Sequence, residues 1–168
     1  MDAKDVTRRA EELFAGGLHC AEAVLLAVLE GEGAAGAGVS PRVASAFGGG
    51  VGRCKEDLCG VLSGGFIALG VLHGRDAAGE KWDQAASLAR SVRERFVQEH
   101  GCTQCGRLLE KFGPQEDMDQ CIRLAGETAG MFHEALRSAQ EPAAASCGCT
   151  ARQPRPGAGA SSCGCGCG

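Results

Sequence analysis

LCGVLSGGFIALGVL, residues 58–72, is the stretch of sequence that decides the fold. It contains no charged residue, and its apolar side chains would cover every side of a helix. A helix that is hydrophobic all round is typical of the centre of a bundle. A glycine within a helix costs about 1 kcal/mol relative to alanine, and this stretch holds Gly60, Gly64, Gly65 and Gly70. We expect close helix packing, or the close approach of a bound group to the backbone, to offset that loss.

Segments on both sides of this stretch predict further helices. Residues 6–14 carry an apolar stripe at helical spacing, residues 20–29 are mostly apolar, and Ser40 and Pro41 open a short helix. Three later segments have helical stripes: residues 80–99, 102–112 and 118–136. The first of these stripes includes Trp82. No segment shows sustained period-two alternation, so the sequence predicts an all-α compact bundle of about six or seven helices.

The composition changes after Pro142 and divides the chain into two parts. Residues 1–140 are expected to form one helical domain. Residues 143–168 contain no Leu, Ile, Val or Phe and are rich in Gly, Ala, Pro and Cys. Such a segment cannot bury enough apolar area to offset the entropy of ordering. We therefore expect residues 141–168 to be a flexible, disordered Cys/Gly-rich tail unless a metal organises it.

Charge and hydropathy exclude several classes of protein. The 168 residues carry a net charge of −4, with a pI near 5.6, which gives no electrostatic footprint for nucleic acid. No signal peptide is visible, and the longest uncharged run, which begins at Leu58, is too short and too glycine-rich for membrane insertion. We expect a cytoplasmic protein. Thiols are kept reduced there, so clustered cysteines favour metal binding or redox chemistry over structural disulfides.

The eleven cysteines are the candidate functional residues, and all of them are candidate metal ligands. Six lie among the predicted helices: Cys20, Cys54, Cys59, Cys102, Cys105 and Cys121. Five lie in the tail: Cys147, Cys149, Cys163, Cys165 and Cys167. The tail cysteines form C-x-C steps, and adjacent thiolates in flexible backbone favour soft ions such as zinc and copper(I).

Local spacing leaves several sites open within the helical part. Cys59 stands near the start of the central helix, where the helix dipole favours a thiolate and burial opposes it. Cys102 and Cys105 form a C-x-x-C within reach of a shared metal or a disulfide. With Cys54 and Cys59 they could supply four thiolates for zinc or an iron–sulfur cluster. Cys121 falls on the apolar stripe of the last helix, where a buried inert thiol is the default.

Five motif segments occur in a fixed order along the chain. They are GLHCAEAV at residues 17–24, FGGGVGR at 47–53, CGVLSG at 59–64, CGRLL at 105–109, and Cys121. The third segment matches the motif CGAxxG, with Val61 in place of the usual alanine. Over residues 5–138 the chain therefore resembles the C_GCAxxG_C_C family of redox-active proteins.

The resemblance implies a core set of cofactor-binding cysteines: Cys20, Cys59, Cys105 and Cys121. It makes Cys54 and Cys102 additional thiols, near enough to the core set in sequence to act as partners. The family fold resembles part of split-Soret cytochrome c, where it is linked with an iron–sulfur centre. Family members are often encoded near transporters. The resemblance thus implies an iron–sulfur cluster or another thiophilic metal as cofactor, and a functional link to a transporter.

Four interpretations follow. The first is a redox protein whose core cysteines bind an iron–sulfur cluster or other metal and pass electrons to an unidentified redox partner. The second is a metal-free thiol–disulfide oxidoreductase with Cys59 and Cys105 as candidate catalytic thiols. Its exchanging pair would be Cys102 with Cys105, or Cys54 with Cys59. The third is a soft-metal binding or trafficking protein that uses the tail, and the fourth is a helical domain with buried structural cysteines. A homodimer is also expected, because a second chain would shield from water a site at the ends of short helices.

Overall fold

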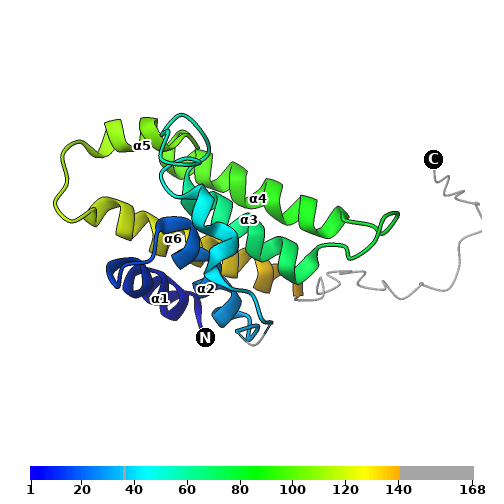
Figure 1. Cartoon of the computed structure of the whole chain (residues 1–168). Coiled ribbons are helices and arrows are strands. Elements are labelled where there is room, and N and C mark those ends of the chain that lie inside the picture. The colour runs from blue at the N-terminus through cyan, green and yellow to red at the C-terminus, as the bar shows by residue number, and fades with distance from the viewer. Residues whose placement is uncertain (36, 141–168) are drawn as a thin grey trace, which may run out of the picture.

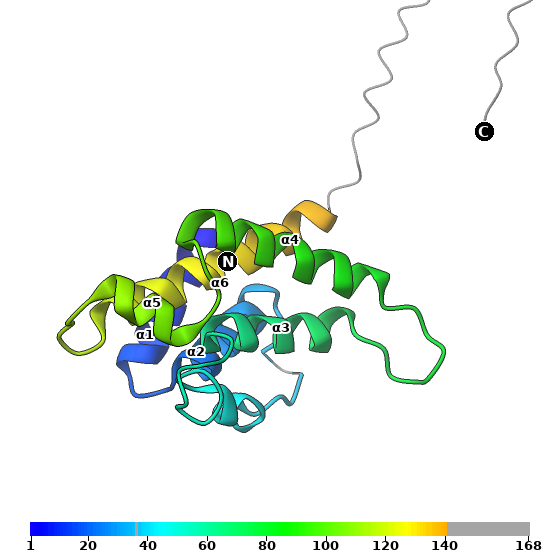
Figure 2. The same cartoon turned by 90° about the horizontal axis from the view of Figure 1, so that it is seen from above.

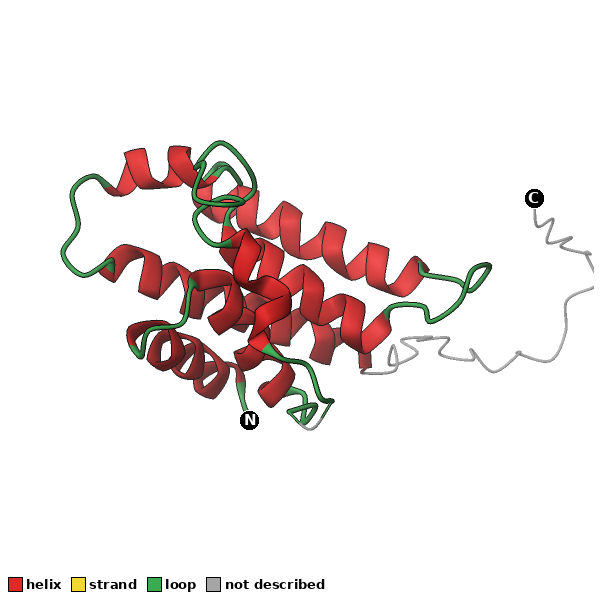
Figure 3. Ribbon diagram, viewed as in Figure 1, coloured by secondary structure: helices red, strands yellow, loops and turns green. Residues whose placement is uncertain are grey.

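The computed structural model describes residues 1–35 and 37–140 of the chain. Its elements are α1 (Ala3–Ala15), α2 (Cys20–Gly31), the 3-10 helix η1 (Pro41–Phe47), α3 (Gly60–His73), α4 (Asp83–His100), α5 (Cys105–Phe112) and α6 (Asp119–Gln140). Within the described residues every named element is a helix (Figure 3), which confirms the predicted all-α bundle. The predicted tail, residues 141–168, lies outside the described part.

The central position of α3 is confirmed. It contacts α2, α4, α6 and η1 (Figure 1), and its side chains Leu62 and Leu69 are buried, whereas Val71 near its end is 39% exposed. A Cβ at Gly64 would lie 2.1 Å from the main-chain oxygen of Ala21 in α2, and a Cβ at Gly65 would lie 2.0 Å from the Phe132 ring in α6. Close packing therefore accounts for both glycines.

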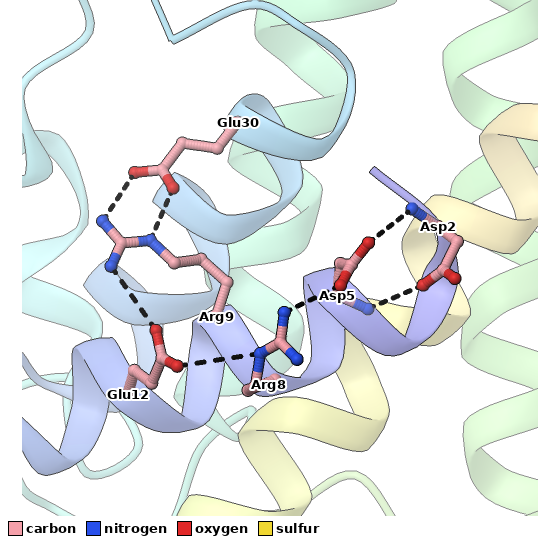
Figure 4. A network of polar contacts seen from close by, with 6 residues as sticks. All are labelled: Asp2, Asp5, Arg8, Arg9, Glu12 and Glu30. Atoms are coloured by element: carbon pink, nitrogen blue, oxygen red, sulfur yellow. Dashed lines mark hydrogen bonds and ion pairs between the residues drawn. The ribbon is translucent and has the colours of Figure 1, made fainter.

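The terminal helices complete the bundle, because α1 packs against α6 and α2, and α2 packs against α6. Figure 4 shows the polar contacts that fix α1. The Asp2 carboxylate accepts the Asp5 amide at 2.8 Å and caps the helix. Farther along, the Arg9 guanidinium contacts the Glu30 carboxylate of α2 at 2.6 Å.

A buried polar pair joins the end of α2 to α6. His133 Nδ1 lies 2.6 Å from Glu32 Oε1, and the two side chains are only 4% and 6% exposed. Gln140 Nε2 donates to the other Glu32 oxygen at 3.2 Å. The carboxylate is thus satisfied where water has little access.

The predicted short third helix is confirmed and is of the 3-10 type. Two other predicted helix boundaries were wrong. The fourth begins at Asp83, so Trp82 is not part of the buried stripe and is 59% exposed. The loop between α3 and α4 precedes this helix and projects beyond the ends of both (Figure 2). In this loop the Glu80 carboxylate accepts a hydrogen bond from the Asp76 amide. Helix α5 begins at Cys105, so Cys102 precedes the helix that was expected to carry it.

None of the helices among the described residues is both long enough and apolar enough to cross a membrane.

Candidate functional site

Cys59 and Cys105 are brought together by a short stretch of antiparallel backbone. The Cys59 amide donates to the Thr103 carbonyl at 2.8 Å, and the Cys105 amide donates to the Asp57 carbonyl at 2.9 Å. The residues immediately before the two cysteines form an isolated antiparallel bridge. The loop that leads into α3 consequently coils beside α5 (Figure 1), and each cysteine stands at the beginning of a helix.

The two thiols affect each other's pKa values. The Cys59 thiol donates a hydrogen bond to the Cys105 sulfur, which lowers the pKa of Cys105 to about 7, and the nearby charge of Lys55 acts in the same direction. Donation of that hydrogen bond, together with burial, raises the pKa of Cys59 well above its ordinary value. The sequence left the protonation of Cys59 open, and the structure favours the thiolate at Cys105 instead. The pair consists of a nucleophilic sulfur and a protonated partner.

A cavity of about 480 Å³ joins this pair to two further cysteines. All four members of the core set line it: Cys20, Cys59, Cys105 and Cys121. Burial raises the pKa of Cys20 and also that of Cys121, although backbone hydrogen bonds to Cys20 and the Gln115 amide, 3.5 Å from the Cys121 sulfur, favour the thiolates. The four cysteines that the family resemblance groups together thus line one cavity, and Cys121 is among them.

Glycines allow the backbone to approach these sulfur atoms. A Cβ at Gly60 would lie 2.5 Å from the Cys20 sulfur, and a Cβ at Gly50 would lie 2.8 Å from Cys105 Cβ. The loop around Gly50 has positive φ angles from Gly49 to Arg53 without interruption, so the chain turns left-handed there. Glycine adopts this conformation without the steric penalty of a side chain.

Cys54 and Cys102 do not line the shared cavity. Cys54 is exposed, and its thiol donates to the Gly50 carbonyl. Cys102 lines a separate surface pocket with Arg107 and Lys111. The structure therefore brings together Cys59 with Cys105, a pair that the local spacings did not predict.

Sequence reasoning missed the basic residues of the cavity, Arg53 and Lys55. The signal that could have found them is their position directly after the glycine-rich segment. Gln115, which contacts Cys121, lies in the connection between two helices and gave no signal.

Four thiols are the donor type that suits zinc or an iron–sulfur cluster. Within the described part of the chain, however, no three His, Cys, Asp or Glu side chains are grouped so that they could hold a metal ion. The four thiols are thus of the ligand type that zinc or an iron–sulfur cluster requires, but their positions in this structure are not those of a metal site. The tail ligands, Cys147, Cys149, Cys163, Cys165 and Cys167, lie outside the described residues.

Together, the helical fold and the shared cysteine cavity define a class of small helical proteins with clustered thiols. Residues 18–135 match the family described as "Putative redox-active protein (C_GCAxxG_C_C)", and the chain belongs to this family. Comparisons with curated proteins and with solved structures gave no match.

Proposed function

We propose that the protein is a thiol–disulfide redox protein in which Cys59 and Cys105 alternate between dithiol and disulfide. The observation that supports this best is the main-chain pairing that brings Cys59 and Cys105 to one cavity, together with the opposite displacement of their pKa values. A pair that is only structural would not need one sulfur poised as a nucleophile at neutral pH.

Cys105 is the attacking thiol in this proposal. A pKa of about 7 leaves a large fraction as thiolate at neutral pH, and thiols with a pKa near the ambient pH attack disulfides fastest. The Cys105 thiolate attacks a substrate disulfide and forms a mixed disulfide, and the released thiolate takes a proton from water. Cys59 then loses its proton and displaces the second thiolate from Cys105. The protein loses two electrons, and the substrate disulfide gains them.

Cys20 and Cys121 remain protonated in this reaction, because burial holds their pKa values above the ordinary range for cysteine. They contribute to the wall of the cavity without exchanging electrons. We propose a cytoplasmic location, where cellular reductants would regenerate the dithiol.

Thiol trapping in defined redox buffers tests the proposal. We expect one two-electron transition, with the disulfide mapped by mass spectrometry to Cys59 and Cys105. The variants Cys59→Ser and Cys105→Ser should lose the transition. The matched controls Cys54→Ser and Cys102→Ser should keep it, because these cysteines do not line the cavity. A disulfide between Cys102 and Cys105 would contradict the assignment.

A second candidate function uses the same cavity. We propose as the alternative that its four cysteines hold an iron–sulfur cluster or another thiophilic metal that carries electrons. The observation in its favour is that the complete core set lines a single cavity, and four thiolates are the usual ligands of such clusters. Binding would require the thiols to lose their protons and draw closer together.

Cys20 and Cys121 distinguish the two candidates. A cluster requires all four thiolates, so Cys20→Ser or Cys121→Ser should reduce the iron, sulfide and visible absorbance of protein prepared without oxygen. A dithiol centre should retain its two-electron transition in both variants. Stoichiometric iron and sulfide in the unaltered protein would favour the cluster.

A further inference from the structure

The shared cavity has a charge opposite to that of the whole protein. The chain carries a net charge of −4, yet the ionisable residues that line the cavity, apart from cysteines, are Arg53, Lys55 and His19. No Asp or Glu from the described residues lines it. The nearby Glu22 does not line the cavity. Its carboxylate accepts hydrogen bonds from the Ser45 hydroxyl and the His19 amide.

The charges and the thiols lie at different depths. Arg53 and Lys55 are exposed, whereas Cys59 and Cys105 are only 6% and 7% exposed. Apolar side chains line the cavity as well, including Phe14 and others from α5 and α6. A molecule that fills this cavity therefore contacts the cationic residues and also places an apolar part beside the thiols. A cavity of about 480 Å³ has the size of a small-molecule site.

From this arrangement we infer that the substrate of the dithiol is a small disulfide that carries carboxylate groups. This inference rests on the proposed function. One carboxylate would lie near Arg53 and Lys55, and the disulfide would lie against Cys105. The reaction converts the protein dithiol and one substrate disulfide into a protein disulfide and two small thiols, so two electrons and two protons pass to the substrate.

Three disulfides of equal arm length and different charge provide the test. They are 3,3′-dithiodipropionate, which is anionic, bis(2-hydroxyethyl) disulfide, which is neutral, and cystamine, which is cationic. We would measure the rate at which each oxidises the reduced full-length protein and divide it by its rate with 2-mercaptoethanol, which removes intrinsic reactivity. We expect the anionic compound to react roughly tenfold or more faster than the cationic one at low salt, because a cleft lined by one sign of charge concentrates counter-ions. The preference should shrink at high ionic strength.

Variants locate the source of the preference. Arg53→Gln should reduce the ratio of the anionic to the neutral rate, since steering acts only on charged substrates. The matched control Arg107→Gln removes a cation that does not line this cavity and should leave the ratio unchanged. Equal normalised rates for the three compounds, or an equal loss in both variants, would overturn the inference while leaving the dithiol function in place. A failure of all three compounds to form the Cys59–Cys105 disulfide would overturn both.

Discussion

Cys105 has a different environment from every other cysteine in the cavity, and the difference comes from single contacts. It receives a hydrogen bond from Cys59 and lies near the charge of Lys55, whereas burial dominates the pKa values of Cys20 and Cys121. The pKa of Cys105 is therefore determined by its neighbours and not by its exposure, which is only 7%.

Alkylation of Cys105 should depend on pH in a defined way. Only the thiolate reacts, so the rate should be half-maximal near the pKa of about 7. Below that pH the rate should fall about tenfold per pH unit, as the protonated form takes over. Iodoacetamide labelling followed by peptide mass spectrometry measures this profile. A midpoint at the ordinary value of 9.0 would contradict the assignment.

Removal of the Cys59 thiol should raise the pKa of Cys105. In Cys59→Ala the thiolate of Cys105 loses its largest stabilising contact, so its pKa should rise and labelling at neutral pH should slow. Lys55→Gln should move the midpoint in the same direction by a smaller amount, because the Lys55 charge is the lesser of the two favourable causes. Cys54→Ser serves as the control, since Cys54 lies outside the cavity.

At the scale of single residues, the sequence identifies which cysteines line the cavity but not which of them lie beside each other. The motif segments select Cys20, Cys59, Cys105 and Cys121, and all four line the cavity. The pairing of Cys59 with Cys105 depends on main-chain hydrogen bonds between distant segments. Spacing along the chain carries no information about such contacts, which is why the C-x-x-C indicated a different pair.

At the scale of elements, the glycines of α3 show how composition and packing are connected. Gly64 lies where α2 leaves no room for a side chain, whereas a Cβ at Gly70 would meet no atom within 4 Å. Both glycines weaken the helix to a similar degree. Only one of them is compensated by close packing.

Alanine at these two positions should therefore have opposite effects. Gly64→Ala forces a methyl group against the main-chain oxygen of Ala21 and should lower the free energy of unfolding by about 1–3 kcal/mol. Gly70→Ala removes backbone entropy from the unfolded state at an open position and should raise it by up to about 1 kcal/mol. Urea denaturation monitored by circular dichroism compares them. Similar destabilisation by both would show that packing is not the reason for Gly64.

The polar link between α2 and α6 provides a second test of element packing. Glu32→Ala leaves the buried His133 without its partner, so the free energy of unfolding should fall by about 1–3 kcal/mol. Glu12→Ala is the control, because its ion pairs on α1 are exposed and contribute less than about 1 kcal/mol. Equal effects would mean that the buried pair adds nothing beyond a surface contact.

The sequence pattern predicted that each helix exists. It predicted the first residues of the helices α4 and α5 incorrectly. Periodicity extended the fourth helix back through Trp82, but a loop stabilised by Glu80 takes up those residues. The start of α5 is set by its pairing with the loop before α3, which delays the helix until Cys105. The first difference arises from a local side-chain contact that competes with the helical pattern, and the second from a contact between distant segments that no local pattern encodes.

At the scale of the whole molecule, the apolar pattern was sufficient to predict the bundle. The buried face of each helix and the uniformly apolar α3 leave few other ways to remove these side chains from water. Arg53 and Lys55 follow the glycine-rich segment, and that position was the one signal for them. Their placement in the cavity depends on the left-handed turn of the loop, which the sequence analysis did not predict.

Removal of residues 141–168 should separate two kinds of thiol chemistry. The four cavity cysteines and the helices that carry them lie within residues 1–140, so a chain ending at Gln140 should keep the pH profile of Cys105. If the tail cysteines capture soft ions, the same truncation should lower the amount of zinc or copper(I) bound per chain. Native mass spectrometry after metal loading measures this, and equal metal content in both chains would exclude the tail as a ligand.

The backbone clamp around Cys59 and Cys105 has a consequence for turnover. Three main-chain hydrogen bonds, the third from the Gly106 amide to the Lys55 carbonyl at 2.6 Å, fasten the two sulfur-bearing segments to each other. Closing or opening a bond between the sulfurs then requires little reorganisation of the scaffold. Such a centre could cycle repeatedly without a change of shape, and a partner would have to sense its oxidation state from the chemistry of the sulfurs alone.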